Sequence, residues 1–381
     1  MAAAQKDQRP VIALDLDEVL GEFVAALAGW HNATFSTAHN VADYDSYHFA
    51  DVWGCGDAEA SKRVWAFFES DDFKNIKPLP GAHEALLGMR ATHRFVVVTS
   101  RQLAIEDATR TWLRRHFDGI FEQVLLANHY AKEGSGPSKT KLELCQAVGA
   151  SVLVDDSLKY VKECSGKLPT VILFGDYAWN SLPEGEGLPQ GTLRAHNWVQ
   201  LRGMLSRVDR MGRVKAQDAV ICTLKHKAEF YANSVRWLLE NQEEVNITGV
   251  GSAIASVVRA QANLERVGDV TVLSTRSGLD AAPPQKERMP RLTVKVKRRP
   301  DLLKKLARIT REAPRFRAAR AQVEATKAAG NIPLGDTSQP TLGNTGSSKL
   351  PPATQVDTVS STTAEFVEGA AAAAHEAARR H

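Results

Sequence analysis

Two aspartates separated by one residue, Asp15 and Asp17, follow a short apolar run near the start of the chain. In an extended strand, residues i and i+2 lie on the same side, so both carboxylates are expected to point in one direction. Two negative charges this close repel each other unless a cation neutralises them or one carboxyl keeps its proton. Beside a divalent cation, one carboxylate could attack a phosphate group while the other transfers the proton. A surface turn is the alternative interpretation, because aspartate is common in turns.

Apolar runs that alternate with helix-like segments predict a sheet that positions this pair. The predicted strands are residues 11–17, 94–101, 121–128, 151–157 and 169–174. The predicted helices are residues 81–93, 104–117, 139–149 and 193–208. Continuous apolar strands separated by helices indicate an α/β fold with a parallel sheet covered on both faces, whose ligands bind at the carboxyl ends of the strands. Polar residues stand at three of these ends: Asp15 and Asp17, Thr99 and Ser100, and Asp155 and Asp156.

The segments around these residues resemble the four motifs of the haloacid dehalogenase (HAD) superfamily, in the same order. The resemblance implies a Rossmann-like sheet and phosphatase chemistry. In these motifs Asp15 would be the nucleophile, Asp17 the general acid and base, and Thr99 a phosphate ligand. Lys141 matches the motif-three lysine. Lys139 is the alternative, and Lys141 is preferred because it opens the helix before the last catalytic strand.

The same resemblance, which covers about residues 9–180, implies a Mg²⁺ cofactor. The residues implied to hold it are Asp15, Asp17, Asp155 and Asp156. The residues implied to contact the substrate phosphate are Thr99, Ser100, Arg101 and Lys141. For Ser100 and Arg101, a role in capping the next helix or lining the pocket is an equal alternative.

A long insertion rich in aromatic residues, about residues 22–80, follows the first strand. It is too long for a plain crossover and predicts a small helical cap over the site. Most of its aromatic side chains are expected to form the cap's own core, and one or two could stack on a ring of the substrate.

A cap at this place, with an arginine after the sequence VTS, resembles the 5'(3')-deoxyribonucleotidase branch of the superfamily. This resemblance implies a phosphomonoesterase with a phosphorylated, nucleotide-like substrate. Glu18 departs from the branch, which commonly has glycine there, and its carboxylate is expected to crowd or repel a nucleotide phosphate. A catalytically degenerate HAD domain that only serves as a scaffold for an RNA-binding protein is therefore the alternative.

A second set of alternating elements follows, at about residues 216–298. Its predicted strands and helices have the order βαβαββ. The sequences FYANSVRWLLE and GVGSAI resemble the Alba proteins, small α+β nucleic-acid binders, and the second matches that family's loop between strand and helix. The resemblance implies RNA or DNA as a partner and allows pairing into homodimers or heterodimers.

Basic residues and a glycine loop in this segment are the candidate nucleic-acid contacts. They are Lys225, His226, Lys227, Gly249, Gly251, Ser252, Arg276, Lys295, Lys297 and Arg298. Glycine lets the backbone approach a phosphate closely, and lysine and arginine neutralise phosphate charge. A solvated face or a localisation signal is the alternative interpretation of the basic stretch.

Charge divides the chain into an acidic front and a basic back. Residues 1–200 carry 19 Lys and Arg against 26 Asp and Glu, a net charge of −7, and the remaining 181 residues carry 29 against 18, a net charge of +11. A basic back half favours polyanionic partners. We therefore expect four parts: a HAD-like domain at 9–205, an Alba-like domain at 216–298, a basic helical extension at 299–327 and a disordered low-complexity tail at 328–381.

Four cysteines without a CxxC pair indicate reduced intracellular thiols. The first ten residues lack an apolar signal core, and no run approaches the ~18 apolar residues of a membrane span. The sequence thus predicts a cytoplasmic or nuclear protein that is not secreted and has no membrane partner.

Overall fold

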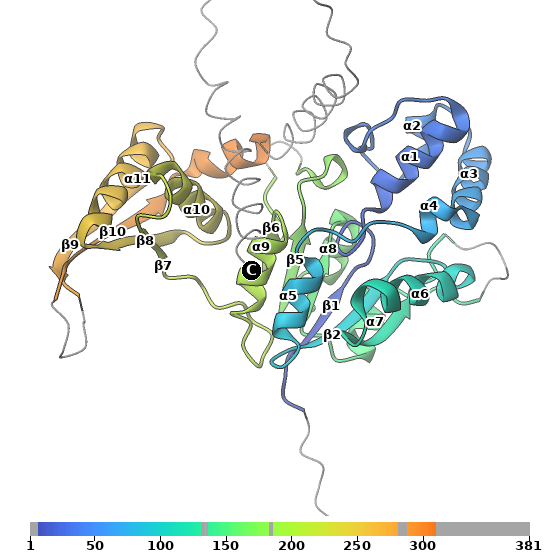
Figure 1. Ribbon diagram of the computed structural model, residues 1–381, viewed down its shortest axis with the longest axis horizontal. Coiled ribbons are helices and arrows are strands. Elements are labelled where there is room, and N and C mark those ends of the chain that lie inside the picture. Colours follow the sequence, from blue (N-terminus) through green and yellow to red (C-terminus); the bar gives the residue numbers. More distant parts are fainter. Residues whose placement is uncertain (1–6, 131–133, 135, 183–185, 281–287, 310–381) are drawn as a thin grey trace, which may run out of the picture. The chain divides into compact units, whose positions relative to one another are not determined.

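The computed structural model describes residues 7–130, 134, 136–182, 186–280 and 288–309 (Figure 1). All of these residues lie in the first of the two units of the chain, Met1–Pro314. The predicted disordered tail and most of the predicted basic extension lie outside the described residues. Among the described helices, none is both long and apolar enough to cross a membrane.

The first sheet has six strands, and every neighbouring pair is parallel. Its order is β3-β2-β1-β4-β5-β6. The strands are β1 (Val11–Leu14), β2 (Arg94–Thr99), β3 (Phe121–Leu126), β4 (Val152–Asp155), β5 (Thr170–Phe174) and β6 (Thr192–Ala195). The parallel α/β sheet predicted from the apolar runs is confirmed. Because β2, β1 and β4 are adjacent, their carboxyl ends meet at one edge, and this edge carries the candidate site.

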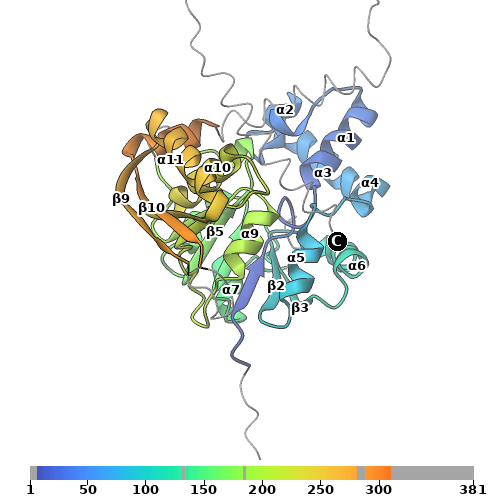
Figure 2. The same ribbon diagram turned by 60° about the vertical axis from the view of Figure 1, so that its left-hand side comes forward.

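Helices cover both faces of this sheet, and alternate residues of β1 point into the two resulting cores (Figures 1 and 2). Ile12 and Leu14 belong to one core, which includes residues of α5 (Ala82–Met89), α6 (Glu106–Phe117) and α9 (Trp198–Leu205). Val11 and Ala13 belong to the other, with α7 (Lys141–Ala147) and α8 (Leu158–Cys164). The continuous apolar sequence of β1 is therefore explained by burial on both sides.

The segment near residue 195 corrects the prediction of one helix over 193–208. Thr192–Ala195 forms the sixth strand, β6, and helix α9 begins only at Trp198. Asn197 fixes this start, because its side chain accepts a hydrogen bond from the Gln200 N–H. A four-residue strand directly before a helix is too short for its periodicity to be recognised.

The insertion after β1 is helical, as its sequence predicts. It contains α1 (Phe23–Phe35), α2 (Phe49–Trp53), α3 (Asp57–Glu69) and α4 (Asp71–Lys74). Phe67 is fully buried among these helices, and its ring lies 5.5 Å from those of Phe23 and Phe73, edge-on to both. These aromatic side chains thus form the insertion's own core.

The second sheet has four strands in the order β7-β8-β10-β9. They are β7 (Ala219–Ile221), β8 (Glu244–Val250), β9 (Val270–Leu279) and β10 (Pro290–Arg298), with β7 parallel to β8 and the other pairs antiparallel. Helices α10 (Ala228–Asn241) and α11 (Ile254–Arg266) pack side by side against the sheet (Figure 2). The element order along the chain is βαβαββ.

The start of the predicted basic extension is a helix that packs on the second sheet's part of the chain. Residues 300–309 are helical, and Leu302 and Leu306 are buried. Lys305 Nζ donates hydrogen bonds to the Val267 carbonyl at 2.6 Å and to Asp269 Oδ1 at 3.0 Å. This part of the extension therefore has a structural role.

Candidate active site

Three carboxylates meet at the carboxyl ends of β1 and β4. Asp15 follows the last residue of β1, Asp155 ends β4, and Asp156 comes next. Because β1 and β4 are hydrogen-bonded neighbours, ligand oxygens of these three residues lie within 4.8 Å of one another. All three residues are buried.

Lys141 is the cation of this cluster. Its Nζ lies 2.8 Å from Asp15 Oδ2 and 2.6 Å from Asp155 Oδ2, and the side chain is completely buried. Thr140 fixes this position as the N-cap of α7, because its hydroxyl accepts a hydrogen bond from the Glu143 N–H and Glu143 accepts one from the Thr140 N–H. The pKa of Lys141 is raised, because the two carboxylates outweigh the burial that would lower it.

The alternative lysine lies elsewhere. Lys139 is exposed, and its backbone N–H donates a hydrogen bond to the Ala127 carbonyl. The geometry therefore favours Lys141 for the motif-three role, as preferred from the sequence.

The cluster holds three carboxyl groups and one lysine. Burial raises the pKa of Asp15 to about 7 against the opposing charge of Lys141. Burial and the neighbouring charge of Asp155 raise the pKa of Asp156 well above its usual range. Three buried carboxyls beside one lysine need a further cation if all are to ionise, and carboxylate oxygens are the ligands that Mg²⁺ prefers. Asp15, Asp155 and Asp156 therefore fit a Mg²⁺ ion.

Asp17 is not in this three-carboxylate group. Because β1 ends at Leu14, Asp17 lies beyond the strand, where the i, i+2 rule for strands no longer applies. Its two carboxylate oxygens accept hydrogen bonds from Arg101, from Nε at 3.0 Å and from Nη2 at 2.6 Å. Arg101, a predicted phosphate ligand, is thus occupied by a carboxylate of the protein.

The end of β2 brings Thr99 and Ser100 to the same edge. Thr99 is fully buried, and its Oγ1 accepts a hydrogen bond from the Arg101 N–H at 3.3 Å. Ser100 and Tyr160 both line the pocket described below, and the ring of Tyr160 lies 4.3 Å from Lys141 Nζ. Tyr160 was not identified from the sequence.

Glu18 does not project freely into the site. Its Oε1 accepts a hydrogen bond at 2.7 Å from the Val24 N–H in the first turn of α1, and its side chain is buried. Its backbone has φ 60°, the left-handed region that favours glycine. Burial raises the pKa of Glu18 to about 8. The expected repulsion is therefore reduced, because a protonated Glu18 carries no charge.

A cavity of about 590 Å³ opens at the site. Aromatic residues that line it are Phe23, Tyr47, Phe49, Trp65, Phe68, Tyr130, Tyr160 and Trp179. Tyr47 OH and Trp179 Nε1 donate hydrogen bonds to Asp156 Oδ2, at 2.9 and 2.7 Å. Trp179 was missed in the sequence analysis, although its place just after the apolar run of β5 was a usable signal. The cavity walls suit a substrate with an aromatic ring.

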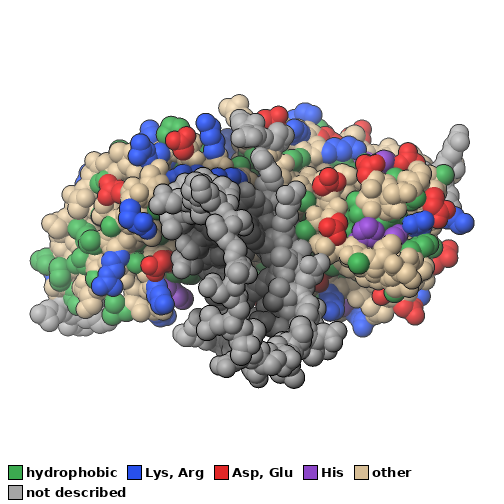
Figure 3. Space-filling view, turned by 90° about the horizontal axis from the view of Figure 1, so that it is seen from above, with side chains coloured by type: hydrophobic (Ala, Val, Ile, Leu, Met, Phe, Trp, Pro, Cys, Tyr) green, Lys and Arg blue, Asp and Glu red, His purple; other side chains and the backbone are tan. Residues whose placement is uncertain are grey.

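The nucleic-acid candidates of the second sheet divide into two groups. Lys225, His226, Lys227 and Arg276 are exposed. The other three basic residues are engaged within the protein: Lys295 Nζ lies 2.5 Å from Glu244, Lys297 Nζ lies 3.3 Å from Glu243, and Arg298 donates to the Leu239 carbonyl. Figure 3 shows that basic and acidic side chains are interspersed on both visible halves of the surface.

The glycine loop of the second sheet has a packing reason for its glycines. A Cβ at Gly249 would lie 2.8 Å from the Val257 side chain, so β8 can approach α11 only without one. Gly251 has φ +58°, which glycine adopts without strain. Ser252 follows in a short 3₁₀ helix, Gly251–Ala253, before α11.

One family of known proteins matches the front part of the chain. The family described as "5' nucleotidase, deoxy (Pyrimidine), cytosolic type C protein" matches residues 9–211, which contain the first sheet and the site. No curated protein matches the chain.

Solved structures that are similar to parts of the chain include HAD-type hydrolases and an Alba protein. A HAD-superfamily hydrolase of subfamily IA from Geobacter sulfurreducens is 16% identical to this chain. The match covers 54% of this chain and 100% of the hydrolase, with a TM-score of 0.35. A haloacid dehalogenase-like hydrolase from Streptococcus pneumoniae is 9% identical, with 45% and 86% covered and a TM-score of 0.34. ALBA1 from Trypanosoma brucei is 16% identical, with 30% and 98% covered and a TM-score of 0.27.

Proposed function

The chain belongs, through residues 9–211, to the family of 5' nucleotidases, deoxy (pyrimidine), cytosolic type C, and is a phosphatase of the 5'-nucleotidase type; we propose that it hydrolyses nucleotide phosphomonoesters with Asp15 as nucleophile and Mg²⁺ as cofactor. The observation that carries this proposal is the contact of one buried lysine, Lys141, with both Asp15 and Asp155, beside Asp156. Lys141, together with a cation held by these carboxylates, would stabilise negative charge that develops on a phosphate group.

The first chemical step is assigned to Asp15 and Asp17. A carboxylate oxygen of Asp15 attacks phosphorus, the ester P–O bond breaks, and the leaving oxygen takes a proton from Asp17. Water then attacks phosphorus of the aspartyl phosphate, gives its proton to Asp17, and releases phosphate and a free Asp15 carboxylate. Before either transfer, Asp17 must separate from Arg101, which then has N–H groups available for the substrate phosphate.

The remaining residues position the reacting groups and neutralise the charge of the phosphate. Asp15, Asp155 and Asp156 would hold Mg²⁺, whose chemistry when bound is to neutralise the charge of the phosphate oxygens. Lys141 fixes the orientation of the Asp15 carboxylate through an ion pair. Thr99 and Ser100 are proposed as ligands of the substrate phosphate. The aromatic walls of the cavity would exclude water and contact the base.

A substrate panel tests this proposal. Phosphate release by the full chain is measured with Mg²⁺ on mononucleotides and on oligonucleotides phosphorylated at the 5' or 3' end. We expect release from at least one member of the panel and release at the level of the blank for Asp15→Asn. Equal inactivity of both proteins on every substrate would reject the proposal.

A scaffold without activity is the second candidate for the first sheet, and the Arg101–Asp17 pair favours it, because it occupies the proposed general acid. Trapping distinguishes the two. A competent site should bind Mg²⁺ together with beryllofluoride, whereas a scaffold would bind neither.

For the second sheet we propose binding of RNA or DNA by an Alba-like domain at about 216–298, beside a HAD-like domain at 9–205 with its cap at 22–80. The exposed Lys225 and Lys227 before α10 and Arg276 on β9 support this, since such cations bind phosphates. Lys295, Lys297 and Arg298 have partners within the protein, so a smaller part of the binding is assigned to them. Pairing of this domain into dimers, and a nuclear in addition to a cytosolic location, remain predictions.

A further inference from the structure

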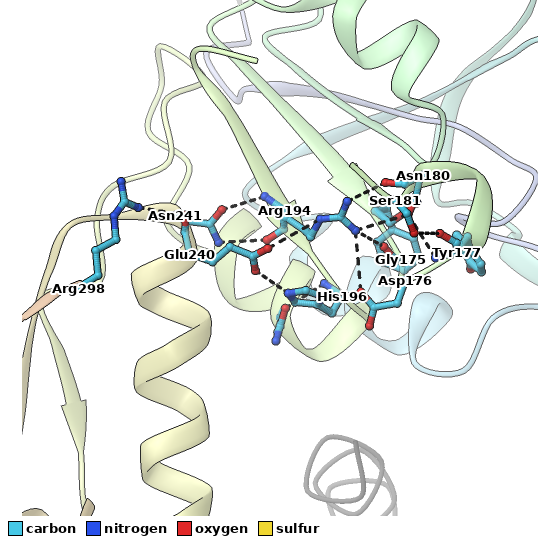
Figure 4. A network of polar contacts seen from close by, with 12 residues as sticks. Gly175, Asp176, Tyr177, Asn180, Ser181, Arg194, His196, Glu240, Asn241 and Arg298 are labelled. Carbon is cyan, nitrogen blue, oxygen red and sulfur yellow. Dashed lines mark hydrogen bonds and ion pairs between the residues drawn. The ribbon is translucent and has the colours of Figure 1, made fainter. Parts of the chain in front are cut away.

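Helix α10, which belongs with the second sheet, contacts the edge strand of the first sheet (Figure 4). The side chain of Asn241, the last residue of α10, accepts a hydrogen bond from the Arg194 N–H at 2.8 Å and donates one to the Arg194 carbonyl at 3.1 Å. One amide thus pairs both backbone groups of a residue in the edge strand β6. An added strand would satisfy these groups in the same way.

Four charged side chains connect this contact to the loop after β5 (Figure 4). His196 lies with Nδ1 against Asp176 and with Nε2 2.6 Å from Glu240 of α10. Arg194 is only 2% exposed and lies 3.9 Å from Asp176 and 3.8 Å from Glu240. Burial opposes the charge of His196, but the carboxylates of Asp176 and Glu240 raise its pKa to about 10, so two cations balance two anions at neutral pH.

The loop of residues 175–180 is held in one conformation by these contacts. The guanidinium of Arg194 donates hydrogen bonds to the carbonyls of Gly175, at 2.9 Å, and Asn180, at 2.8 Å. Gly175 has φ +83°, and a Cβ there would lie 2.2 Å from the ring of Tyr177. Only glycine allows this close turn.

The other side of the same loop reaches the phosphatase site. The rings of Tyr177 and Trp179 stack at 4.5 Å with an angle of 6° between them. Tyr177 OH donates a hydrogen bond to the Glu18 carbonyl at 2.9 Å, and Trp179 Nε1 donates one to Asp156 at 2.7 Å. In the loop, two residues therefore separate Asp176, which pairs with His196, from Trp179, which contacts a proposed metal ligand.

We propose that α10 is a positioning element of the phosphatase site, in which Glu240 acts through His196 and Asp176 to keep Trp179 hydrogen-bonded to Asp156. Neither Glu240 nor Asn241 is a catalytic residue, because neither touches the cavity. The inference rests on the proposed function for its effect on rate, and it makes the second sheet's part of the chain necessary for full activity.

The position of Trp179 can be measured without any enzyme assay. The full chain contains seven tryptophans. They are labelled with 5-fluorotryptophan, and Trp179→Phe identifies the ¹⁹F resonance of Trp179. We expect Glu240→Ala to shift or broaden that resonance. The matched control is Glu243→Ala, which removes an exposed glutamate paired with Lys297, and it should leave the Trp179 resonance unchanged.

Kinetics then test whether the position matters. We expect Glu240→Ala to lower kcat by roughly 3- to 30-fold with KM changed less than about twofold, since coupling through such networks has about this size. Trp179→Phe should lower kcat similarly. The double variant should be no slower than the slower single variant, because both changes break the same chain of contacts. Multiplying effects would mean that Glu240 acts only on general stability.

The outcomes separate this inference from the proposed function. If the wild type releases no phosphate from any substrate, the function is wrong, and the ¹⁹F spectrum alone decides the positioning. If the wild type is active and Glu240→Ala changes neither kcat nor the Trp179 resonance, the positioning role is wrong and the function stands. If Glu240→Ala does not fold, Asn241→Ala replaces it, and an unchanged Trp179 resonance in that variant overturns the inference.

Discussion

Arg101 donates hydrogen bonds to both carboxylate oxygens of Asp17, the proposed general acid and base. Its Nη1 donates to Thr109 Oγ1 at 3.1 Å, and its guanidinium lies 4.9 Å from the centre of the Phe73 ring. Arg101 is 5% and Asp17 17% exposed at the side chain. The proposed general acid and base is therefore held by a buried guanidinium.

Removing Arg101 should destabilise the folded protein, because the Asp17 carboxylate would lose its ion-pair partner. We expect Arg101→Met to lower the free energy of unfolding by about 3 kcal/mol, because breaking a buried ion pair leaves one charge uncompensated. Arg101→Met combined with Asp17→Asn should recover most of this loss. Urea unfolding of the single and double variants measures it, and losses that simply add would show that the pair is not coupled.

Removing Lys141 should make the fold depend more on divalent cations. Lys141→Met leaves three buried carboxyls without their lysine, so we expect a lower Tm at neutral pH and a larger rise in Tm on addition of Mg²⁺ than in the wild type. Activity should fall to the blank. Lys139→Met is the matched control, since Lys139 is exposed, and it should retain the wild-type Tm and Mg²⁺ response. Identical behaviour of the two variants would contradict the assignment of Lys141.

The buried carboxyl of Glu18 should make stability depend on pH. Burial raises its pKa from 4.5 to about 8, so its contribution to stability is complete below pH 4.5 and is lost as the pH rises through 8. Glu18→Gln does not titrate. Its free energy of unfolding, relative to wild type, should increase between pH 4.5 and 8 by up to ~1.4 kcal/mol per pH unit.

The measurement for Glu18 is urea unfolding at several pH values. The control variant, Glu69→Gln, makes the same substitution at an exposed glutamate at the end of α3 and serves as the reference curve. A flat difference for Glu18→Gln would mean that Glu18 is ionised in the folded protein.

The two groups of lysines in the second sheet should differ in nucleic-acid binding. We expect Lys225→Ala with Lys227→Ala to weaken binding of a single-stranded RNA or DNA and to reduce the slope of log K against log salt by up to about 2, one for each phosphate contact. Lys295→Ala with Lys297→Ala should change the slope less, because these lysines already pair with Glu244 and Glu243. Binding isotherms at several salt concentrations test this, and equal slopes for the two pairs would contradict it.

The sequence predicted the parts of this structure that depend on local pattern. Strand β1 and its partner β4 were recognisable as apolar runs, and their order along the chain was enough to bring Asp15 and Asp155 to one edge. Lys141 was preferred to Lys139 because it opens the helix before β4, and in the structure α7 begins at Lys141, after a capping box formed by Thr140 and Glu143.

Contacts between distant segments were beyond the sequence. Nothing local marks Arg101 as the partner of Asp17 rather than of a substrate, since the two residues are 84 positions apart. The sequence predicted that the carboxylate of Glu18 would repel a nucleotide phosphate. In the structure, the backbone turn at Glu18, with φ 60°, directs its side chain to the first turn of α1 instead. Strand β6 was missed because its four residues are too few for a recognisable pattern, and no periodicity reveals that Asn241 of α10 pairs with its edge.

The proposed mechanism requires the Asp15 carboxylate to form a covalent bond to phosphorus, and this bond can be trapped chemically. The full chain is mixed with Mg²⁺ and a substrate that it hydrolyses, and the reaction is quenched in denaturant during turnover. The protein is then reduced with borohydride and digested, and the mass of the peptide that contains residue 15 is measured. We expect Asp15 to be converted to homoserine only when substrate is present. Continued phosphate release with Asp15 unmodified, or with the label on another residue, would contradict it.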